Sequence, residues 1–159
     1  MNKIYLLLGS NMGNSREQLS VAAGYIEKQV GLIKRQSSLY VTAAWGLRHQ
    51  PDFLNQVLVV ETTLTATETL TTILQIEKVM GRVRTVKNAP RVIDIDILFF
   101  NKEMINKPSL VIPHPEIPNR RFVLTPLNEL APGFKHPFLR QTIHQLLRDC
   151  TDMLDVKKF

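Results

Sequence analysis

Residues 90–98, PRVIDIDIL, form the strand from which the rest of the fold can be predicted, and they place Asp94 and Asp96 two residues apart within it. Side chains alternate between the two faces of a strand, so both aspartates share one face while the isoleucines occupy the other. Two carboxylates this close repel each other unless one is protonated or a cation lies between them. Oxygen ligands on a rigid strand suit Mg²⁺. The stretch therefore predicts a magnesium site.

An edge strand whose outward face is simply wet, with both carboxylates solvated, is the alternative interpretation. The neighbouring cations favour the metal site, since Arg82, Arg84, Lys87 and Arg91 precede the aspartates within a short segment. Mg²⁺ is usually held by one or two carboxylates together with substrate phosphates, and arginine binds phosphate oxygens bidentately. The combination indicates a nucleotide-dependent enzyme.

The length and composition indicate one ordinary globular domain, residues 1–159. The chain is 44% hydrophobic and 21% charged, which is typical of soluble proteins. No apolar run approaches the roughly 18 residues of a membrane-spanning helix, so we expect no membrane association. The apolar run at residues 4–8 is too short for a signal peptide. The single cysteine, Cys150, has no partner for a disulfide, which fits a reducing environment, and we expect a cytoplasmic location.

The pattern of apolar residues predicts the order β-α-β-β-α-β. The first helix begins at Asn14, with Glu17 three residues on, and ends at Gly31; the second begins with the capping box of Thr65 and Glu68. The expected strands are residues 4–8, 32–42, 53–62 and the strand of Asp94. The expected core residues of the second helix, which ends at Gly81, are Leu70, Ile73, Leu74 and Met80.

This order is the ferredoxin-like arrangement, an α+β fold (α/β sandwich) in which an antiparallel sheet carries both helices on one face. A Pro-rich segment follows from residue 102, and then a C-terminal helical extension. We expect the other face of the sheet to be uncovered and to bind ligands.

Five sequence blocks, in one order, carry a family resemblance. They are LGSN at 8–11, QPDFLN at 50–55, Ile76-Glu77 with GRVR at 81–84, PRVIDIDI at 90–97, and PHP at 113–115 with NRRF at 119–122. Together they resemble the 6-hydroxymethyl-7,8-dihydropterin pyrophosphokinases of folate biosynthesis. The resemblance implies transfer of the terminal pyrophosphate of ATP to the hydroxymethyl group of the reduced pterin, with AMP released and two Mg²⁺ ions required.

The resemblance also implies a role for individual residues. Asp94 and Asp96 would bind both metals. The catalytic residues would be Arg82, Arg91, Asp94 and Asp96. The ATP-binding residues would be Glu77, Arg82, Arg84, Arg91, Ile97, His114 and Arg120. The pterin-binding residues would be Thr42, Trp45, Phe53, Asn55, Asp94 and Phe122.

The pterin assignment has its own physical argument. A flat heteroaromatic ring can lie between the faces of Phe53 and Phe122, and the coplanar donor and acceptor of Asn55 can bind its polar edge. Alternation puts Phe53 and Asn55 on one face of their strand. Both phenylalanines could instead be ordinary core residues.

Two other residues have an alternative interpretation. His114, between two prolines, could contact only backbone. Glu77 lies on the apolar face of its helix, so its side chain either extends past the core or points into the site.

The chain departs from the family pattern in two loops. Members often carry Pro where this chain has Ala44, and often a Trp in the loop before the aspartates, where residues 85–89 contain no aromatic residue. The one tryptophan, Trp45, would cover the pterin from the other loop.

The net charge of +6 and the expected fold leave two alternatives to an enzyme. The fold also serves RNA recognition, but the chain lacks the paired aromatic residues of such modules, and the aspartates would repel a phosphate backbone. A non-catalytic domain that binds a regulatory small molecule is the other alternative. We expect ATP and the pterin as partners, no nucleic acid, and a monomer.

Overall fold

The architecture rests on a sheet of six strands, seen in a computed structural model that describes residues 1–43, 51–81 and 92–159. The elements along the chain are β1 (Asn2–Ser10), α1 (Ser15–Gln29), β2 (Leu32–Gln36), β3 (Tyr40–Thr42), β4 (Phe53–Thr62), α2 (Ala66–Val79), β5 (Asp94–Phe100), β6 (Ile105–Lys107), β7 (Leu110–Ile112), a 3₁₀ turn (Ile117–Asn119), α3 (Arg121–Leu130), α4 (Ile143–Asp149) and β8 (Val156–Lys158). The predicted α+β class is confirmed, and the order β-α-β-β-α-β is found when β2 and β3 are taken together as the second predicted strand.

The strand order is β5-β1-β4-β3-β8, with β2 also paired to β4, and the pairings are antiparallel. The register places Gly9 of β1 opposite Asn55 of β4 on one side and Asp94 of β5 on the other. Two pairs further along, Leu7 lies opposite Asp96. Three neighbouring strands therefore bring a glycine, an amide and two carboxylates together on one face.

The strand expected at residues 32–42 was wrong as a single element, because the chain forms β2 and then β3. Between them, Ser37 makes two hydrogen bonds to Val57 of β4 in place of the regular backbone pairing. Its backbone N–H donates to the carbonyl oxygen of Val57 at 2.9 Å, and its hydroxyl accepts the N–H of Val57 at 2.9 Å. A side-chain hydroxyl in place of a backbone carbonyl lets the chain bend while it remains paired to β4.

Both helix starts are confirmed. Asn14 accepts the N–H of Glu17 at 3.1 Å, and the capping box of Thr65 and Glu68 is complete. In α2 the expectation for Leu74 was wrong, since this side chain is 42% exposed. The buried stripe runs through Ile73, Ile76 and Glu77 at spacings of three and four, and Leu74 points about 100° away from Ile73.

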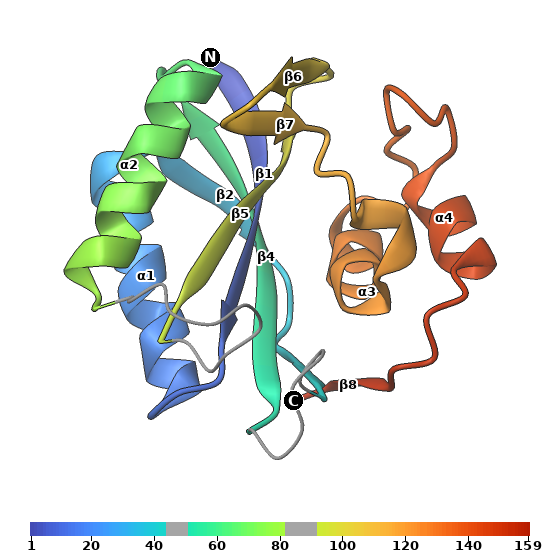
Figure 1. The fold of residues 1–159 in the computed structure, drawn as a ribbon, viewed down its shortest axis with the longest axis horizontal. Helices are drawn as coiled ribbons and strands as arrows, with labels where there is room; N and C mark the ends of the chain where they lie inside the picture. The colour runs from blue at the N-terminus through green and yellow to red at the C-terminus, as the bar shows by residue number, and fades with distance from the viewer. Residues whose placement is uncertain (44–50, 82–91) are drawn as a thin grey trace.

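The second face of the sheet is covered, contrary to expectation. Helices α1 and α2 pack on one face and α3 and α4 on the other (Figure 1). The cause is the strands themselves, which are apolar on both faces over much of their length and need a layer on each side. The strand side chains that meet α3 and α4 are Tyr5, Leu7, Val57, Val59, Leu98 and Phe99.

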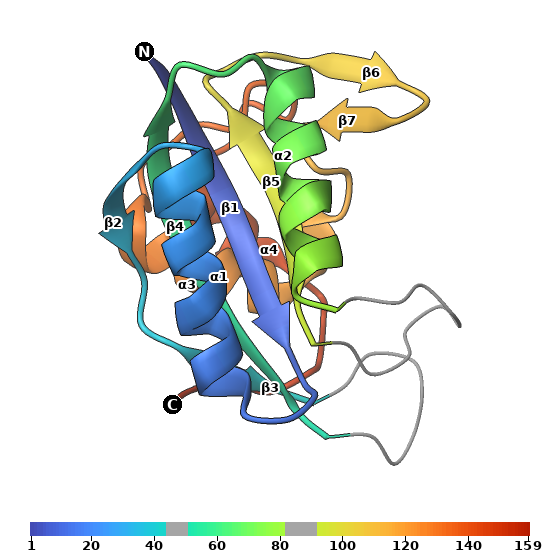
Figure 2. The same ribbon diagram turned by 90° about the vertical axis from the view of Figure 1, so that its left-hand side faces the viewer.

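Two further features complete the description of the fold. The β6–β7 hairpin lies at the sheet edge, beside β5 and α2 (Figure 2). Within the part of the chain that the structure describes, no helix combines the length and apolarity needed to cross a membrane.

Candidate functional site

A pocket opens where the second face of the sheet becomes polar. It lies at the C-terminal end of β1, the N-terminal ends of β4 and β5, and the start of α3. Its lining comprises Leu7, Gly9, Thr42, Ala43, Phe53, Asn55, Asp94, Asp96, Arg120 and Phe122. Every described residue that the resemblance assigned to the pterin is in this set. Trp45, the remaining one, lies outside the described residues and stays a prediction.

Thr42 and Asn55 contribute unsatisfied polar atoms to this pocket. Both residues are 3% exposed, and neither Oγ1 of Thr42 nor Nδ2 of Asn55 has a hydrogen-bond partner among the described residues. A buried polar group without a partner costs about 1–3 kcal/mol. Because Thr42 pairs with Phe53 in the β3–β4 register, the two atoms lie beside an aromatic ring. A planar ligand with polar edges would satisfy them.

The aromatic residues of the pocket come from different elements, Phe53 from β4 and Phe122 from α3. The guanidinium of Arg120 lies 5.8 Å from the centroid of the Phe122 ring. The pocket is thus bordered by two aromatic rings and a cation, a combination that suits a flat aromatic ligand with an anionic group attached.

Gly9 is required by the position of Asn55. A Cβ at residue 9 would lie 2.8 Å from Oδ1 of Asn55 and 3.8 Å from Cδ1 of Phe53. Gly9→Ala is therefore expected to turn the Asn55 amide rather than to break the fold. We expect about a tenfold loss of pterin affinity, since one misaligned hydrogen bond is worth about 1.4 kcal/mol, with little change in thermal unfolding. Gly24→Ala, in α1 with no atom within 4 Å of the added Cβ, is the control.

Asp94 and Asp96 lie on the same face of β5, as predicted, and both line the pocket while remaining half-buried. Among residues 1–43, 51–81 and 92–159 no group of three or more His, Cys, Asp or Glu side chains could hold a metal. Two carboxylates on one face of a strand are nevertheless what Mg²⁺ needs when phosphates and water supply the other ligands. The donor set fits that ion.

A second hollow lies on the other side of Asp96, at the sheet edge. Its lining comprises Leu70, Ile95, Asp96, Ile97, Ser109, Leu110, Val111, His114 and Pro115. It includes Ile97 and His114, which the resemblance assigned to ATP. Asp96 therefore lines both hollows.

The sequence did not single out Leu70 or residues 109–111 of the hairpin for the second hollow. These residues are mostly apolar and carry no reactive group, so no chemical signal could have marked them. Only the folding of the β6–β7 hairpin beside β5 reveals their position.

His114 makes the backbone contacts that one of its two interpretations required, and its ATP contact stays a prediction. Its Nδ1 accepts the N–H of Glu116 at 3.2 Å, and its own N–H donates to the carbonyl oxygen of Leu98 at 3.0 Å. Burial lowers the pKa of His114, and the charge of Arg120 lowers it further, against weaker opposing effects of Glu116 and Asp94. The neutral ring then carries its proton on Nε2, where it can be donated to a phosphate oxygen.

Glu77 has a defined structural contact. It is 3% exposed, and its Oε2 accepts the backbone N–H of Ile95 at 2.7 Å. Ile95 lies between the two aspartates, so the carboxylate fixes the start of β5. Glu77 lines neither of the two hollows described here, and its ATP contact stays a prediction.

Arg82, Arg84, Lys87 and Arg91 lie outside the described residues, so their phosphate contacts stay predictions. Of the predicted cations, the structure describes Arg120, at the mouth of the first pocket.

Acid is expected to destabilise the protein through its buried histidines. The Nδ1 of His136 accepts the N–H groups of Phe138 and Leu139 at 3.2 and 3.0 Å, and burial lowers its pKa. In the unfolded chain the histidine binds a proton near pH 6.5, whereas in the folded chain it is protonated only at lower pH. The free energy of unfolding therefore falls as pH drops below about 6.5. His114 acts in the same direction.

Urea unfolding at pH 7.5, 6.0 and 5.0 measures this effect. In His136→Asn the amide oxygen can still accept an N–H but does not titrate, so the acid dependence should shrink. An unchanged pH dependence in that variant would contradict the role of His136.

Comparison with known proteins identifies relatives of this chain. A family model for 7,8-dihydro-6-hydroxymethylpterin-pyrophosphokinase (HPPK) matches residues 5–132. The chain is 38% identical over 145 residues to a 2-amino-4-hydroxy-6-hydroxymethyldihydropteridine pyrophosphokinase of Aquifex aeolicus, an alignment that covers 91% of this chain and 90% of that protein.

Other relatives are longer. The chain is 41% identical over 145 residues to the folic acid synthesis protein FOL1 of Dictyostelium discoideum, covering 91% of this chain but 22% of that protein. Among solved structures, the HPPK-DHPS of Plasmodium falciparum with pterin and p-hydroxybenzoate has a TM-score of 0.76 at 21% identity, covering 92% of this chain and 43% of that one. That likeness shows the fold.

Proposed function

The chain belongs to the 7,8-dihydro-6-hydroxymethylpterin-pyrophosphokinase family, and we propose that it transfers the terminal diphosphate of ATP to the hydroxymethyl group of 6-hydroxymethyl-7,8-dihydropterin, releasing AMP. The observation that carries the proposal is the pair of hollows that meet at Asp96. One hollow suits a flat polar ring, and the other contains the residues expected to bind the nucleotide.

The pterin occupies the first pocket in this proposal. Its ring lies between Phe53 and Phe122, and its polar edge binds the buried amide of Asn55 and hydroxyl of Thr42. This placement supplies the partners that both atoms lack and points the hydroxymethyl group toward the carboxylates. Asp94 and Trp45 complete the contacts.

Asp94 and Asp96 hold two Mg²⁺ ions, which would neutralise charge on the ATP phosphates. The two carboxylates share one face of a strand fixed by Glu77, so their separation is set before ligands bind. Oxygen ligands positioned in advance lose little free energy to reorganisation during the reaction.

His114 and the arginines bind the triphosphate. His114 donates from Nε2 and Arg120 binds from the start of α3, and Arg82, Arg84 and Arg91 are expected to bind the phosphates as well. Ile97 borders the base. The pterin hydroxyl attacks the β-phosphorus in line with the leaving AMP oxygen, and catalysis comes mainly from positioning and from charge stabilisation by Arg82 and Arg91.

The remaining expectations belong to the same proposal. The chain acts as one domain, as a monomer in the cytoplasm, and has no nucleic-acid partner. The chain matches most of the Aquifex aeolicus protein, whereas the longer relatives contain additional sequence.

AMP formation tests the proposal. Purified protein is incubated with ATP and Mg²⁺, with and without 6-hydroxymethyl-7,8-dihydropterin, and AMP is quantified by chromatography. AMP that requires both the pterin and the metal supports the enzyme. If folded protein binds the pterin but forms no AMP, the chain is a small-molecule-binding domain instead.

A further inference from the structure

The C-terminal segment supplies the cap of helix α3. Arg120 occupies the N-cap position of this helix but makes no capping hydrogen bond with its side chain. Instead, Oδ2 of Asp152 accepts the backbone N–H of Arg121 at 2.9 Å. The first N–H groups of a helix lack partners within the helix, and a carboxylate there is favourable for the helix dipole. The start of α3 is thus fixed by a residue beyond α4.

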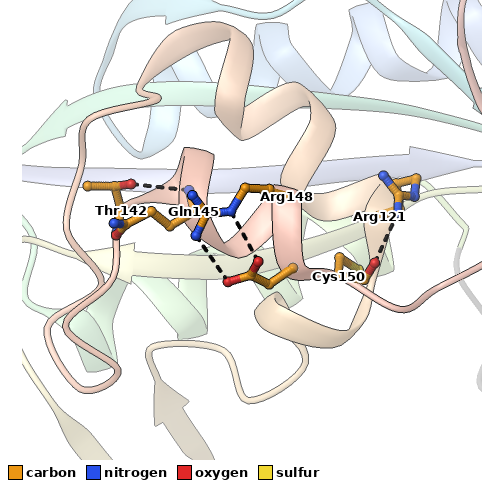
Figure 3. A network of polar contacts seen from close by, with 6 residues as sticks. Arg121, Thr142, Gln145, Arg148 and Cys150 are labelled. Atoms are coloured by element: carbon orange, nitrogen blue, oxygen red, sulfur yellow. Dashed lines mark hydrogen bonds and ion pairs between the residues drawn. The ribbon is translucent and has the colours of Figure 1, made fainter.

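Arg121 holds the same segment through its side chain. Its Nε donates to the carbonyl oxygen of Asp152 at 3.2 Å. Its Nη2 donates to the carbonyl oxygen of Cys150 at 3.1 Å (Figure 3). The other carboxylate oxygen of Asp152 accepts the N–H of Leu154 at 3.0 Å. The orientation of the Asp152 carboxylate is therefore determined from two directions.

The segment then reaches β3, another element that lines the first pocket. Strand β8 pairs with β3, and its Val156 lies opposite Thr42. The N–H of Phe159 donates to the carbonyl oxygen of Leu39 at 2.8 Å, and the ring of Phe159 lies 5.9 Å from the guanidinium of Arg16. Residues 150–158, which we call the tail clamp, join the start of α3 to β3.

The two joined elements both contribute residues to the lining of the pocket. Phe122 follows the capped residue in α3, and Thr42 is the last residue of β3. We propose that Asp152, through the tail clamp, is a positioning residue for the pterin pocket. The inference rests on the proposed function. It concerns a segment beyond residue 132, where the match to the family model ends.

Three variants test the role of Asp152. Asp152→Ala removes the acceptor for the Arg121 N–H, Asp152→Asn keeps a side-chain oxygen that can accept it, and Asp155→Ala is the control in the same segment. The carboxylate of Asp155 is 74% exposed and pairs only across 3.4 Å with Lys157. The probe ligands are 6-hydroxymethyl-7,8-dihydropterin, titrated with Mg²⁺ and a non-hydrolysable ATP analogue, and AMP titrated alone.

We expect Asp152→Ala to weaken pterin binding about tenfold, the scale of losing a helix cap. AMP lacks the phosphates near Arg120. Its dissociation constant for Asp152→Ala should therefore stay within about twofold of the value for the unaltered chain, because losing an exposed contact has only a modest energetic effect. Asp152→Asn should restore most of the pterin affinity, and Asp155→Ala should match the unaltered chain.

Other outcomes would overturn the inference. Unchanged pterin affinity in Asp152→Ala, or equal losses for pterin and AMP, would leave Asp152 a purely structural role. A native chain that binds no pterin would overturn the proposed function as well. Amide exchange at Arg121 and Phe122 separates these failures, because it reports the cap without any ligand.

Discussion

Replacing Asp94 and Asp96 together with alanine is expected to lower AMP formation at least about 10³-fold, the scale of losing a metal-centred charge stabilisation. The two side chains lie on one face of β5, two residues apart, and line the pocket. Among the described residues that line the two hollows there is no other pair of carboxylates. Without Asp94 and Asp96 the phosphates would therefore lose their metal.

The fold should survive this change. Both side chains are half-buried and lie outside the two apolar core clusters, so their removal opens no cavity among the core side chains. Thermal unfolding without Mg²⁺ should stay close to the native value. The backbone of β5 remains fixed by the contact from Glu77 to Ile95.

Mg²⁺ dependence makes the prediction specific. Asp94→Asn and Asp96→Asn each keep an oxygen ligand but lose a charge, so each should retain some activity and require a higher Mg²⁺ concentration. Asp155→Ala, an exposed carboxylate of the tail, is the control. A double variant that still forms AMP at the native rate would exclude Asp94 and Asp96 as the metal ligands.

Local sequence predicted the parts of the site that depend on alternation within one strand. Asp94 and Asp96 share a face, and so do Phe53 and Asn55, as the period of two requires. The register between strands has no local signature. The alignment of Gly9 with both Asn55 and Asp94 is therefore a finding of the structure, as is the clash that a side chain at residue 9 would cause.

Contacts between distant segments account for the errors and omissions. The second face of the sheet was expected to be open because the C-terminal residues had no assigned place, whereas α3 and α4 cover it. The cap from Asp152 to Arg121 spans 31 residues and belongs to no motif. Glu77 was recognised as anomalous on an apolar helix face, yet its partner is a backbone N–H, which a sequence does not reveal.

Asn55→Ala is expected to weaken pterin binding about 100-fold, because a site built to hydrogen-bond its ligand discriminates strongly when one polar partner is removed. The Asn55 side chain is 3% exposed, and its Nδ2 has no partner among the described residues. That donor is already desolvated, so the bound ring gains a hydrogen bond without a further dehydration cost on the protein side.

The same feature predicts a large effect on binding and a small one on stability. A buried donor without a partner destabilises the folded chain, and its removal offsets the packing lost with the side chain, so the free energy of unfolding of Asn55→Ala in the absence of ligand should be close to the native value. Asn55→Asp keeps the shape and the acceptor but loses the donor, and it adds a charge near Asp94; it should bind the pterin no better than Asn55→Ala. Isothermal titration with the pterin and urea unfolding without it measure the two effects.

Gln56→Ala is the matched control. Gln56 is the next residue of β4, and its amide donates to the carbonyl oxygen of Ser37 at 2.9 Å instead of lining the pocket. It should lose some stability and keep its pterin affinity, the reverse of Asn55→Ala. If both variants lost stability and both bound the pterin normally, Asn55 would be an ordinary structural amide, and the pocket would have to recognise its ligand through Phe53, Phe122 and Thr42 alone.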